Sequence, residues 1–472
     1  MYPSSRSAIS AAIAIALIAS TEAATASNGV VTVGPFGTAA NCTTSDLQAA
    51  IELAASDQWD DEIRVTKIGP NFVDGYTQQA LSIPRNPAVS PGQSLTIIGG
   101  YDSCLPDAQP NGRTRLSGAG GAARSVIEIR GNSEIRLSHF DIVDGDEQAG
   151  SNGGGIDVNG SGHLFLNDIQ LRDNRAGFGG GLYARGGGGQ LQVYLEDDVS
   201  IQNNEASRNG GGIYVSGSAK LDWWGSNAVL WFNRATGFDS GNGLSEGYGG
   251  GLFISGARAK IDAKGPVLVT PVPVIFANHA RFGGGAALNA ADGGDARLDL
   301  SSPDGATPQI LANNAASERG GALYAKPYVD QSGAYSATMC IADVSVRDNI
   351  AADGAAIFLD NDDATLVTNR PRAALFFNRP HVDRCSDPPR SCAASSQCSD
   401  ITRNVAQDVD GNATSGAIIH AKSGNVYGEA WVRGVTVTGN RGGPVVDVDS
   451  GESVEFDNIL FAANVVAGPV IT

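Results

Sequence analysis

The sequence is poor in basic residues and, after its first 26 residues, in long apolar runs. Lysine and arginine together number 32, against 50 aspartate and glutamate residues, so the chain of 472 residues carries a formal net charge of -18. A chain of this charge repels polyanions, which argues against nucleic acid or an anionic membrane surface as a partner. No apolar run after residue 26 approaches the roughly 20 residues of a transmembrane helix, so we expect no transmembrane segment.

Charged side chains and proline are also few, and each scarcity excludes a class of chain. Charged residues make up 17% of the sequence and hydrophobic residues 42%, a balance that excludes disorder driven by high charge. Only 20 prolines are present, and the 62 glycines form clusters such as 153–155 and 249–251 instead of occupying every third position, which excludes collagen. The clustered glycines therefore indicate some other repeating structure.

The N-terminus has the pattern of a secretory signal peptide. Arg6 precedes an apolar run over residues 8–18, and small residues follow at Ala24 and Ala26. We therefore expect residues 1–26 to be a signal peptide, and the protein to be exported and either secreted or held at the cell surface.

Export makes disulfide bonds the default role of the cysteines, which number six. Cys42 and Cys104 lie in the N-terminal region, and pairing within each region is the simplest scheme. The C-terminal group leaves its pairing open and consists of Cys340, Cys385, Cys392 and Cys398. His381 stands close to Cys385 and suggests zinc as an alternative, but no C-x-x-C spacing occurs, so we expect no metal at these cysteines.

One motif recurs along the chain: an apolar residue, an asparagine three positions later, then a glycine cluster and a short apolar segment. Residues 171–174 and 179–184 form one copy. The asparagines predicted to form a ladder are Asn174, Asn204, Asn233, Asn278, Asn313 and Asn349 in clear copies, and Asn404 and Asn440 in weaker copies. Two further weak copies contain Asn378 and Asn464, and the mean spacing of about 32 residues is typical of solenoids.

Each repeat contains the period of β-strands. Leu191, Val193 and Leu195 alternate with polar or amphipathic residues, and apolar segments at 182–184 and 199–201 complete three short strands. Helix is disfavoured because each glycine inside a helix costs about 1 kcal/mol. Three strands and three turns in about 30 residues describe one coil of a parallel β-helix.

The recurring asparagines and glycines then acquire a structural role. Coils stack at about 4.8 Å, so an asparagine at the same turn of each coil would form a ladder of side-chain hydrogen bonds. The glycines would supply positive φ or close backbone approach at the bends. A ligand or metal contact is the alternative role for the asparagines; the clusters lack the in-register aspartate of a calcium-binding nonapeptide repeat.

The ends and interruptions of the repeat suggest a domain organisation. Residues 45–55 read as an amphipathic helix with a capping box of Ser45 and Gln48, which would cover the first coil. We therefore expect an N-terminal cap over residues 27–60 and a β-helix over residues 61–472. Three loop inserts interrupt it near 237–248, 264–273 and 379–400, and such loops are common binding sites.

The repeats resemble those of chlamydial polymorphic outer membrane proteins and of bacterial right-handed parallel β-helix repeat proteins in the pectate-lyase-like superfamily. The opening, with Cys42, Ser45 and residues 95–101, is also similar to the entry of such a helix, and the resemblance covers residues 41–472. It implies an all-β, right-handed parallel β-helix with three strands per coil, on a bacterial protein. It implies no activity, because this fold hosts lyases, hydrolases and adhesins.

Candidates for chemistry are few. Asp360, Asp362 and Asp363 could bind calcium, although a solvated turn explains them equally well. A sugar-binding aromatic platform could form from Trp223, Trp224 and Trp231. Adjacent tryptophans on a strand point to opposite faces, so at most one of the first two lies outside. The five histidines are scattered without ligand spacing, and no motif supplies a catalytic residue.

Two functions are compatible with this pattern. The first is an exported β-helix scaffold for adhesion or surface interaction, with a glycan or a surface protein as partner, no cofactor, and calcium as the one candidate ion. The alternative is a β-helix that binds or degrades polysaccharide, as a lyase or a glycoside hydrolase. Three or more carboxylates in a groove beside an arginine or lysine would favour the enzyme.

Overall fold

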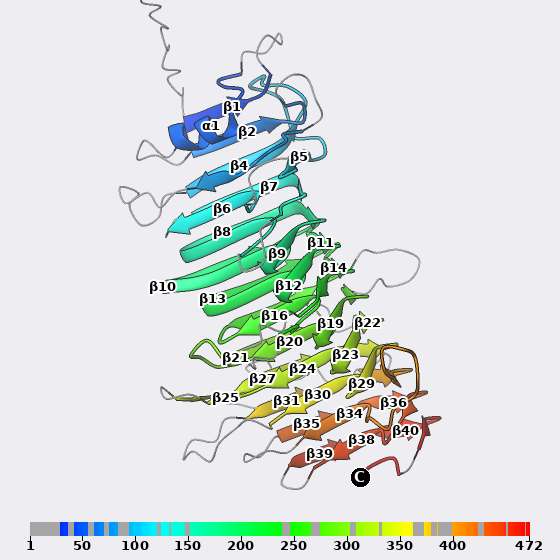
Figure 1. Ribbon diagram of the computed structural model, residues 1–472. Coiled ribbons are helices and arrows are strands. Elements are labelled where there is room, and N and C mark those ends of the chain that lie inside the picture. Colours follow the sequence, from blue (N-terminus) through cyan, green and yellow to red (C-terminus); the bar gives the residue numbers. More distant parts are fainter. Residues whose placement is uncertain are drawn as a thin grey trace, which may run out of the picture.

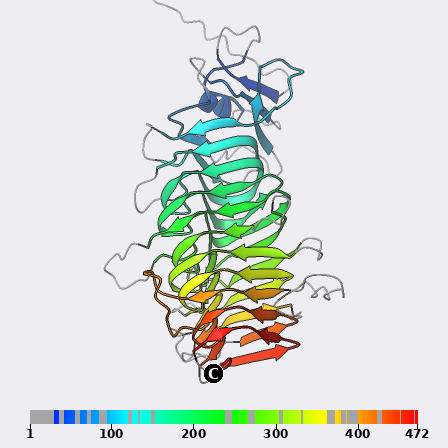
Figure 2. The same cartoon turned by 90° about the vertical axis from the view of Figure 1, so that its right-hand side faces the viewer.

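The computed structural model describes the chain from residue 29 to residue 472 with gaps. The gaps are residues 36–41, 55–60, 70–74, 84–93, 120–123, 132–133, 147–151, 238–245, 266–273, 303–307, 330–332, 362–371, 379–384, 386–398, 423–428, 450–451 and 468. The predicted signal peptide lies outside the described residues, as do most residues of the three predicted inserts. The described chain is an all-β solenoid whose parallel strands stack in sequence order from one end to the other (Figures 1 and 2).

Each coil contributes strands to three faces of the solenoid. Face 1 contains β3 (Leu81–Ile83), β6 (Ile127–Gly131), the first parts of β8 (Ile156–Arg172), β10 (Leu182–Leu195) and β13 (Ile213–Gly225), then β16 (Leu252–Ser255), β20 (Ala286–Asn289), β24 (Leu323–Lys326), β30 (Ile357–Asp360), β34 (Ile419–Lys422) and β38 (Val446–Val448). Face 2 contains β1 (Val30–Val33), β2 (Asp61–Thr66), β4 (Ser94–Tyr101), the first part of β7 (Glu134–Val143), later parts of β8, β10 and β13, then β17 (Arg258–Ala263), β21 (Ala296–Ser301), β27 (Ala337–Ala342), β31 (Ala373–Phe377), β35 (Glu429–Arg433) and β39 (Ser453–Asp457).

Face 3 closes the coil, and a short extra sheet follows it. Face 3 contains β5 (Thr114–Ser117), the ends of β7 and β8, then β11 (Ser200–Gln202), β14 (Val229–Trp231), β18 (Ile275–Phe276), β22 (Gln309–Ala312), β28 (Val344–Arg347), β32 (Asp400–Thr402), β36 (Thr436–Thr438) and β40 (Leu460–Ala462). The extra sheet, here called the side sheet, contains β9 (Arg175–Phe178), β12 (Glu205–Asn209), β15 (Arg234–Ala235), β19 (His279–Phe282), β23 (Ala315–Arg319), β29 (Ile350–Asp353), β33 (Val405–Ala406), β37 (Arg441–Gly442) and β41 (Val465–Val466). Two strands of two residues each, β25 (Tyr328–Val329) and β26 (Ala334–Tyr335), form a separate antiparallel pair. The prediction of three strands per coil is thus confirmed, and the side sheet adds a fourth short one.

The alternation seen in the sequence places apolar side chains inside the solenoid. Val193 in β10 lies opposite Leu164 of the preceding coil and Leu221 of the next one, and all three are buried. Their neighbours in sequence, such as Gln192 and Tyr194, point outward and are only half-buried. Each inward aliphatic side chain stabilises the fold by about 1.5–3 kcal/mol through burial, so the stacked columns form one continuous core.

A second, smaller core lies outside face 1. Outward side chains of face 1 meet Phe178 and Phe282 of the side sheet. The buried members of this cluster are Tyr183, Tyr214, Tyr248, Phe253, Phe282, Ala287, Tyr324 and Phe358. The side sheet therefore covers face 1 and removes its aromatic side chains from solvent.

Helix α1 (Leu47–Ala54) packs against β1, β2 and β3 at the N-terminal end (Figure 1). The predicted capping box is wrong: the Asp46 carboxylate caps the helix and accepts the backbone N–H groups of Gln48 at 2.8 Å and Ala49 at 3.2 Å. The Gln48 side chain instead pairs with the backbone of Ser82 in β3. Asp46, and not Ser45, is the N-cap because it lies immediately before the first helical residue.

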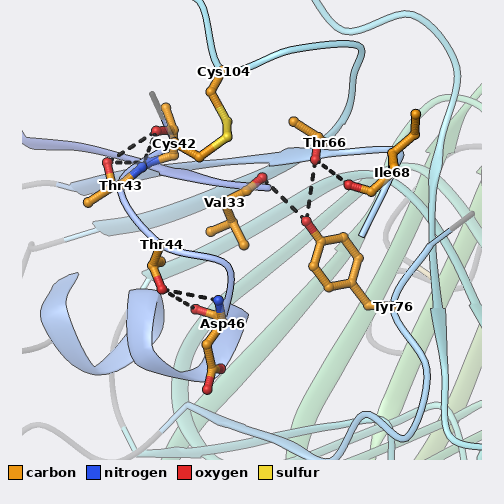
Figure 3. Close-up of a disulfide and its surroundings, with 10 residues drawn as sticks. Val33, Cys42, Thr43, Thr44, Asp46, Thr66, Ile68, Tyr76 and Cys104 are labelled. Carbon is orange, nitrogen blue, oxygen red and sulfur yellow. Dashed lines mark hydrogen bonds between the residues drawn. A yellow bond between two sulfur atoms is a disulfide. The ribbon is translucent and has the colours of Figure 1, made fainter. Parts of the chain in front are cut away.

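A disulfide bond fastens the same end. Cys42, just before α1, joins Cys104 in the loop after β4 (Figure 3). Beside it, the Tyr76 hydroxyl donates to the carbonyl oxygen of Val33 at 3.3 Å. The chain segment leading into the helix is thereby tied to the first coils.

A ladder of buried asparagines runs along the corner between face 3 and the side sheet. The side-chain N–H of each donates to Oδ1 of the asparagine on the next coil at 2.9–3.1 Å. Within the described chain its members are Asn174, Asn204, Asn233, Asn278, Asn314, Asn349, Asn404, Asn440 and Asn464. The second N–H of each reaches a backbone carbonyl of the preceding coil, as from Asn204 to Leu171 at 2.9 Å.

The prediction of Asn313 in this ladder is wrong by one position. Asn314 makes the ladder bonds, whereas Asn313 is exposed and has φ of 53°. Two apolar residues, Ile310 and Leu311, precede two asparagines, so the motif fits this segment in two registers that differ by one residue. Leu311 is the inward residue that corresponds to Leu171 in the first clear copy. The weaker copy at Asn378 also lies elsewhere, where its Oδ1 accepts the backbone N–H of Asp343.

Glycines follow the ladder where coils approach most closely. Gly179 has φ of 61°, and a Cβ on Gly180 would lie 2.5 Å from the carbonyl oxygen of Gly211. No side chain fits at such a distance, so the glycine clusters allow the side sheet to fold back over face 1.

Candidate functional site

On the outer side of the ladder lie the residues that precede its asparagines, together with Asp144, which precedes Gly145 at the equivalent turn of the coil before Asn174. This row, here called the left-handed row, has φ between 52° and 59°. Its described non-glycine members are Asp144, Asp173, Asn203, Phe232, Ala277, Asn313, Asp348, Arg403 and Ala463. Such a φ costs roughly 1–2 kcal/mol for an ordinary L-residue, and the ladder bonds on the adjacent asparagine hold it in place. Each coil that carries one of these residues thus presents a side chain at this corner on a backbone held by the ladder.

The three candidate tryptophans separate in the structure. Trp223 is 1% exposed in the core, whereas Trp224 is 47% exposed on the outside of face 2, as expected for adjacent residues of one strand. Trp231 lies on the outside of face 3, one residue before Phe232 of the left-handed row. The predicted platform of three tryptophans therefore does not form.

Trp231 belongs instead to an aromatic cluster that the sequence reasoning missed. Its ring centroid lies 6.3 Å from that of Phe232 and 5.8 Å from that of Phe276, and the two phenylalanine rings are 5.8 Å apart. All three pairs meet edge to face. Phe276 is the partner of Trp231 on the next coil, and Phe232 is 52% exposed. This aromatic cluster lies on the outside of a rigid sheet.

A polar depression adjoins the cluster along the same corner. It has a volume of ≈ 380 Å³ and is lined by Asp144, Gly145, Asp146, Asp173, Arg175, Asn203 and Glu205. Asn203 occupies the left-handed row one coil before Phe232, and its backbone N–H donates to the carbonyl oxygen of Trp231 at 3.1 Å. The depression and the aromatic cluster thus occupy successive coils; together they are called the corner site below.

Two of the carboxylates in the depression already have partners. Asp144 accepts Arg115 and the hydroxyl of Ser117, both at 2.9 Å. Asp173 pairs with Arg172 at 3.0 Å. Four carboxylates beside Arg175 meet the condition that favours an enzyme, although ion pairs with Arg115 and Arg172 occupy two of the four.

The side sheet supplies the other wall of the corner site as a row of alternating charge. Arg175 lies opposite Asp146 of the preceding coil and Glu205 of the next, and Arg234 follows Glu205. His279 comes next, and burial followed by the charge of Arg234 lowers its pKa. Hydrogen-bond donors and acceptors therefore alternate along this wall.

The calcium candidates lie far along the chain from this corner. Asp360 is buried and accepts Arg319 at 2.8 Å and the Tyr324 hydroxyl at 2.6 Å, while Asp362 and Asp363 lie outside the described residues. Across the part of the chain that the structure describes, no three or more His, Cys, Asp or Glu side chains are placed to hold a metal ion.

Another titratable cluster surrounds His420 in β34. Its Nδ1 lies 2.7 Å from Asp353 of the side sheet and its Nε2 lies 3.7 Å from Asp449. Burial opposes the charge of His420, but the hydrogen bond and attraction of Asp353, with the charges of Asp447 and Asp449, raise its pKa. The ring also packs edge to face on Phe358. Because this cluster lies between two coils and adjoins the second core, it links coils together.

Among the other cysteines, Cys340 forms a disulfide with Cys385. Cys392 and Cys398 lie outside the described residues. Two disulfides are typical of an oxidising, extracellular environment. In the described helical structure, nothing is long and apolar enough to cross a membrane.

Comparisons with known proteins add no relative. No family model matches the chain, and neither a curated protein nor a solved structure is significantly similar to it. The corner site therefore has to be interpreted from its own chemistry.

Proposed function

We propose that the protein is an exported β-helix scaffold for adhesion or surface interaction, and that the corner site is its binding surface. The observation that carries this proposal is the aromatic cluster of Trp231, Phe232 and Phe276, in which Phe232 is exposed and the other two side chains are partly buried. Rigid aromatic side chains give large contact area at little entropic cost, and they are enriched where proteins bind partners. The resemblance of the repeats to bacterial surface proteins supports the same function.

Surface binding can be tested with fluorescently labelled protein. We expect it to be retained on bacterial or eukaryotic cells, or on beads coated with cell-wall polysaccharide. The variant Trp231→Ala/Phe232→Asn should lose retention about tenfold or more, as for other aromatic binding residues. Trp224→Ala is the matched control, because it removes an exposed tryptophan from face 2. Equal retention of both variants, or no retention of the unaltered protein, would contradict the proposal.

A second candidate function is cleavage of polysaccharide. The carboxylates of the depression favour it, because glycoside hydrolysis uses a pair of Asp or Glu residues across the scissile bond. Asp146 and Glu205 are the pair to test, since Asp144 and Asp173 are held by arginines. New reducing ends or unsaturated products from the unaltered protein, absent with Asp146→Asn/Glu205→Gln, would replace the scaffold proposal with this one.

A further inference from the structure

The geometry points to an uncharged oligosaccharide as the ligand of the corner site, stacked on Phe232 and Trp231 and hydrogen-bonded in the adjoining depression. This inference rests on the proposed function, since it names the partner of the same surface.

The aromatic cluster provides the apolar half of the recognition. Phe232 is half-exposed, and Trp231 and Phe276 hold it from two sides by edge-to-face contacts. The C–H face of a pyranose ring offers a flat apolar surface of matching size to such a ring. Of the three rings, Phe232 exposes the largest share to solvent and is the one placed to stack on a sugar ring.

The depression provides the polar half. Carboxylate oxygens of Asp146 and Glu205 accept hydrogen bonds only, Arg175 donates only, and Asn203 does both. Vicinal hydroxyl groups both donate and accept, so they can satisfy this mixed lining along its whole length. The volume of ≈ 380 Å³ falls within the range of small-molecule sites.

The charges argue against an acidic sugar. Arg115 and Arg172 neutralise Asp144 and Asp173, and along the side sheet Asp146, Arg175, Glu205 and Arg234 alternate in sign. No face of the corner site is therefore cationic, and a uronate chain would meet Asp146 and Glu205, with Arg175 as one cation between them, on a protein of net charge -18. Repulsion of this kind selects an uncharged ligand.

The length of the corner site argues for an oligosaccharide. The left-handed row passes through Asp144, Asp173, Asn203, Phe232 and Ala277 on five successive coils. At about 4.8 Å per coil, the first and last of these lie roughly 19 Å apart. Because the ladder fixes the backbone of every coil, an extended chain parallel to the solenoid axis would bind without ordering the protein first.

Hexasaccharides of uniform length are the direct probes. We would titrate the protein with β-1,4-linked hexamers of glucose, xylose and N-acetylglucosamine, and with hexagalacturonate, by calorimetry and tryptophan fluorescence. At least one uncharged hexamer should bind, and hexagalacturonate should bind about tenfold more weakly or not at all. Trp231 should report binding, so its replacement by Phe should abolish most of the fluorescence change.

Two variants test the aromatic cluster and the depression separately, and neither is expected to change the backbone conformation. Phe232→Asn places at this position the residue type already found at Asn203, which tolerates the same φ. It should weaken binding of the uncharged hexamer about tenfold or more. Asp146→Asn/Glu205→Gln removes charge but not shape, and should weaken it several-fold. Trp224→Ala and Asp107→Asn, both exposed elsewhere, should bind as the unaltered protein does.

Several results would overturn the inference. These are binding of hexagalacturonate alone, unchanged affinity of Phe232→Asn, or no binding of any uncharged hexamer. They can be told apart from failure of the proposed function, because retention on cells is measured separately. A protein that stays on cells through Trp231 and Phe232 but binds no sugar would keep the scaffold proposal and eliminate the saccharide ligand.

Discussion

His420 and Asp353 form a hydrogen-bonded ion pair of 2.7 Å between face 1 and the side sheet. Burial and the hydrogen bond act in opposite directions on each partner. For Asp353, burial would raise the pKa, but His420 and the backbone N–H groups of Ala417 and Gly354 lower it. The pKa of His420 is raised, so both groups are charged in mildly acidic solution.

This pair predicts a pH window for stability. A raised histidine pKa contributes stability below the unfolded value of about 6.5, which is lost as pH rises through the folded pKa. The lowered aspartate pKa contributes above about 3.9 and is lost as pH falls through its folded value. His420→Gln should therefore lower the melting temperature most near pH 5 and least near pH 8. His163→Gln, at an exposed histidine, is the control; a pH-independent difference for His420→Gln would contradict the assignment.

The position of the ladder predicts opposite results for two neighbouring asparagines. Asn314→Ala removes hydrogen bonds to Asn278, Asn349 and the backbone of Ile275. Each buried group left without a partner costs about 1–3 kcal/mol, so the loss should exceed that of a surface change. Asn313→Gly should be neutral or slightly stabilising, because glycine accepts positive φ. Chemical denaturation and amide hydrogen exchange of the surrounding coils measure both; equal losses would show that the ladder is misplaced.

The disulfide between Cys42 and Cys104 predicts local loss of stability on reduction. It closes a loop over a sequence separation of 62 residues, and loss of such a bond typically costs about 2–5 kcal/mol. Cys42→Ser/Cys104→Ser should expose α1 and β1 to hydrogen exchange first. Exchange at distant coils such as β28 and β32 should not change, because in a solenoid each coil contacts mainly its neighbours. Uniform loss along the chain would contradict this local effect.

Asp360 predicts a stability loss that does not depend on calcium. Asp360→Ala leaves the buried Tyr324 hydroxyl and the partly exposed Arg319 without this acceptor, and a buried polar group left without its partner costs about 1–3 kcal/mol. The melting temperature should fall equally in chelator and in millimolar calcium. Tyr324→Phe, which removes a single hydrogen bond, should cost less. Calcium-dependent stability that Asp360→Ala abolishes would restore the ion-binding interpretation.

The repeat could be predicted from the sequence because its strands and bends depend on residues that are close together in the chain. Alternating apolar residues such as Leu191, Val193 and Leu195 predict strands, and glycine clusters predict bends. Burial of one of two adjacent tryptophans followed from strand geometry alone. The local sequence could not distinguish Asn313 from Asn314 as the ladder residue, because two apolar residues precede the two asparagines. Only hydrogen bonds to the asparagines of the neighbouring coils select Asn314.

The corner site was hidden for a different reason. Phe232 looks like a core residue in the sequence, and its exposure depends on the left-handed backbone at the ladder turn. Tyr183 and Tyr214 show the reverse, because they point outward from face 1 and are buried by the side sheet. The side sheet folds back and packs on the outer surface of face 1. The alternation of residues along a strand gives no information about this contact.

The left-handed row has a consequence for how this molecule can diversify. Its backbone is set by the buried asparagines, whereas its side chains are Asp, Asn, Phe, Ala and Arg on different coils. Residues of different size and charge are therefore accepted at these positions, with the backbone cost of roughly 1–2 kcal/mol that the left-handed φ imposes on each. The ligand specificity of this corner can therefore change through single substitutions in the left-handed row, one on each coil, while the fold of the solenoid stays the same.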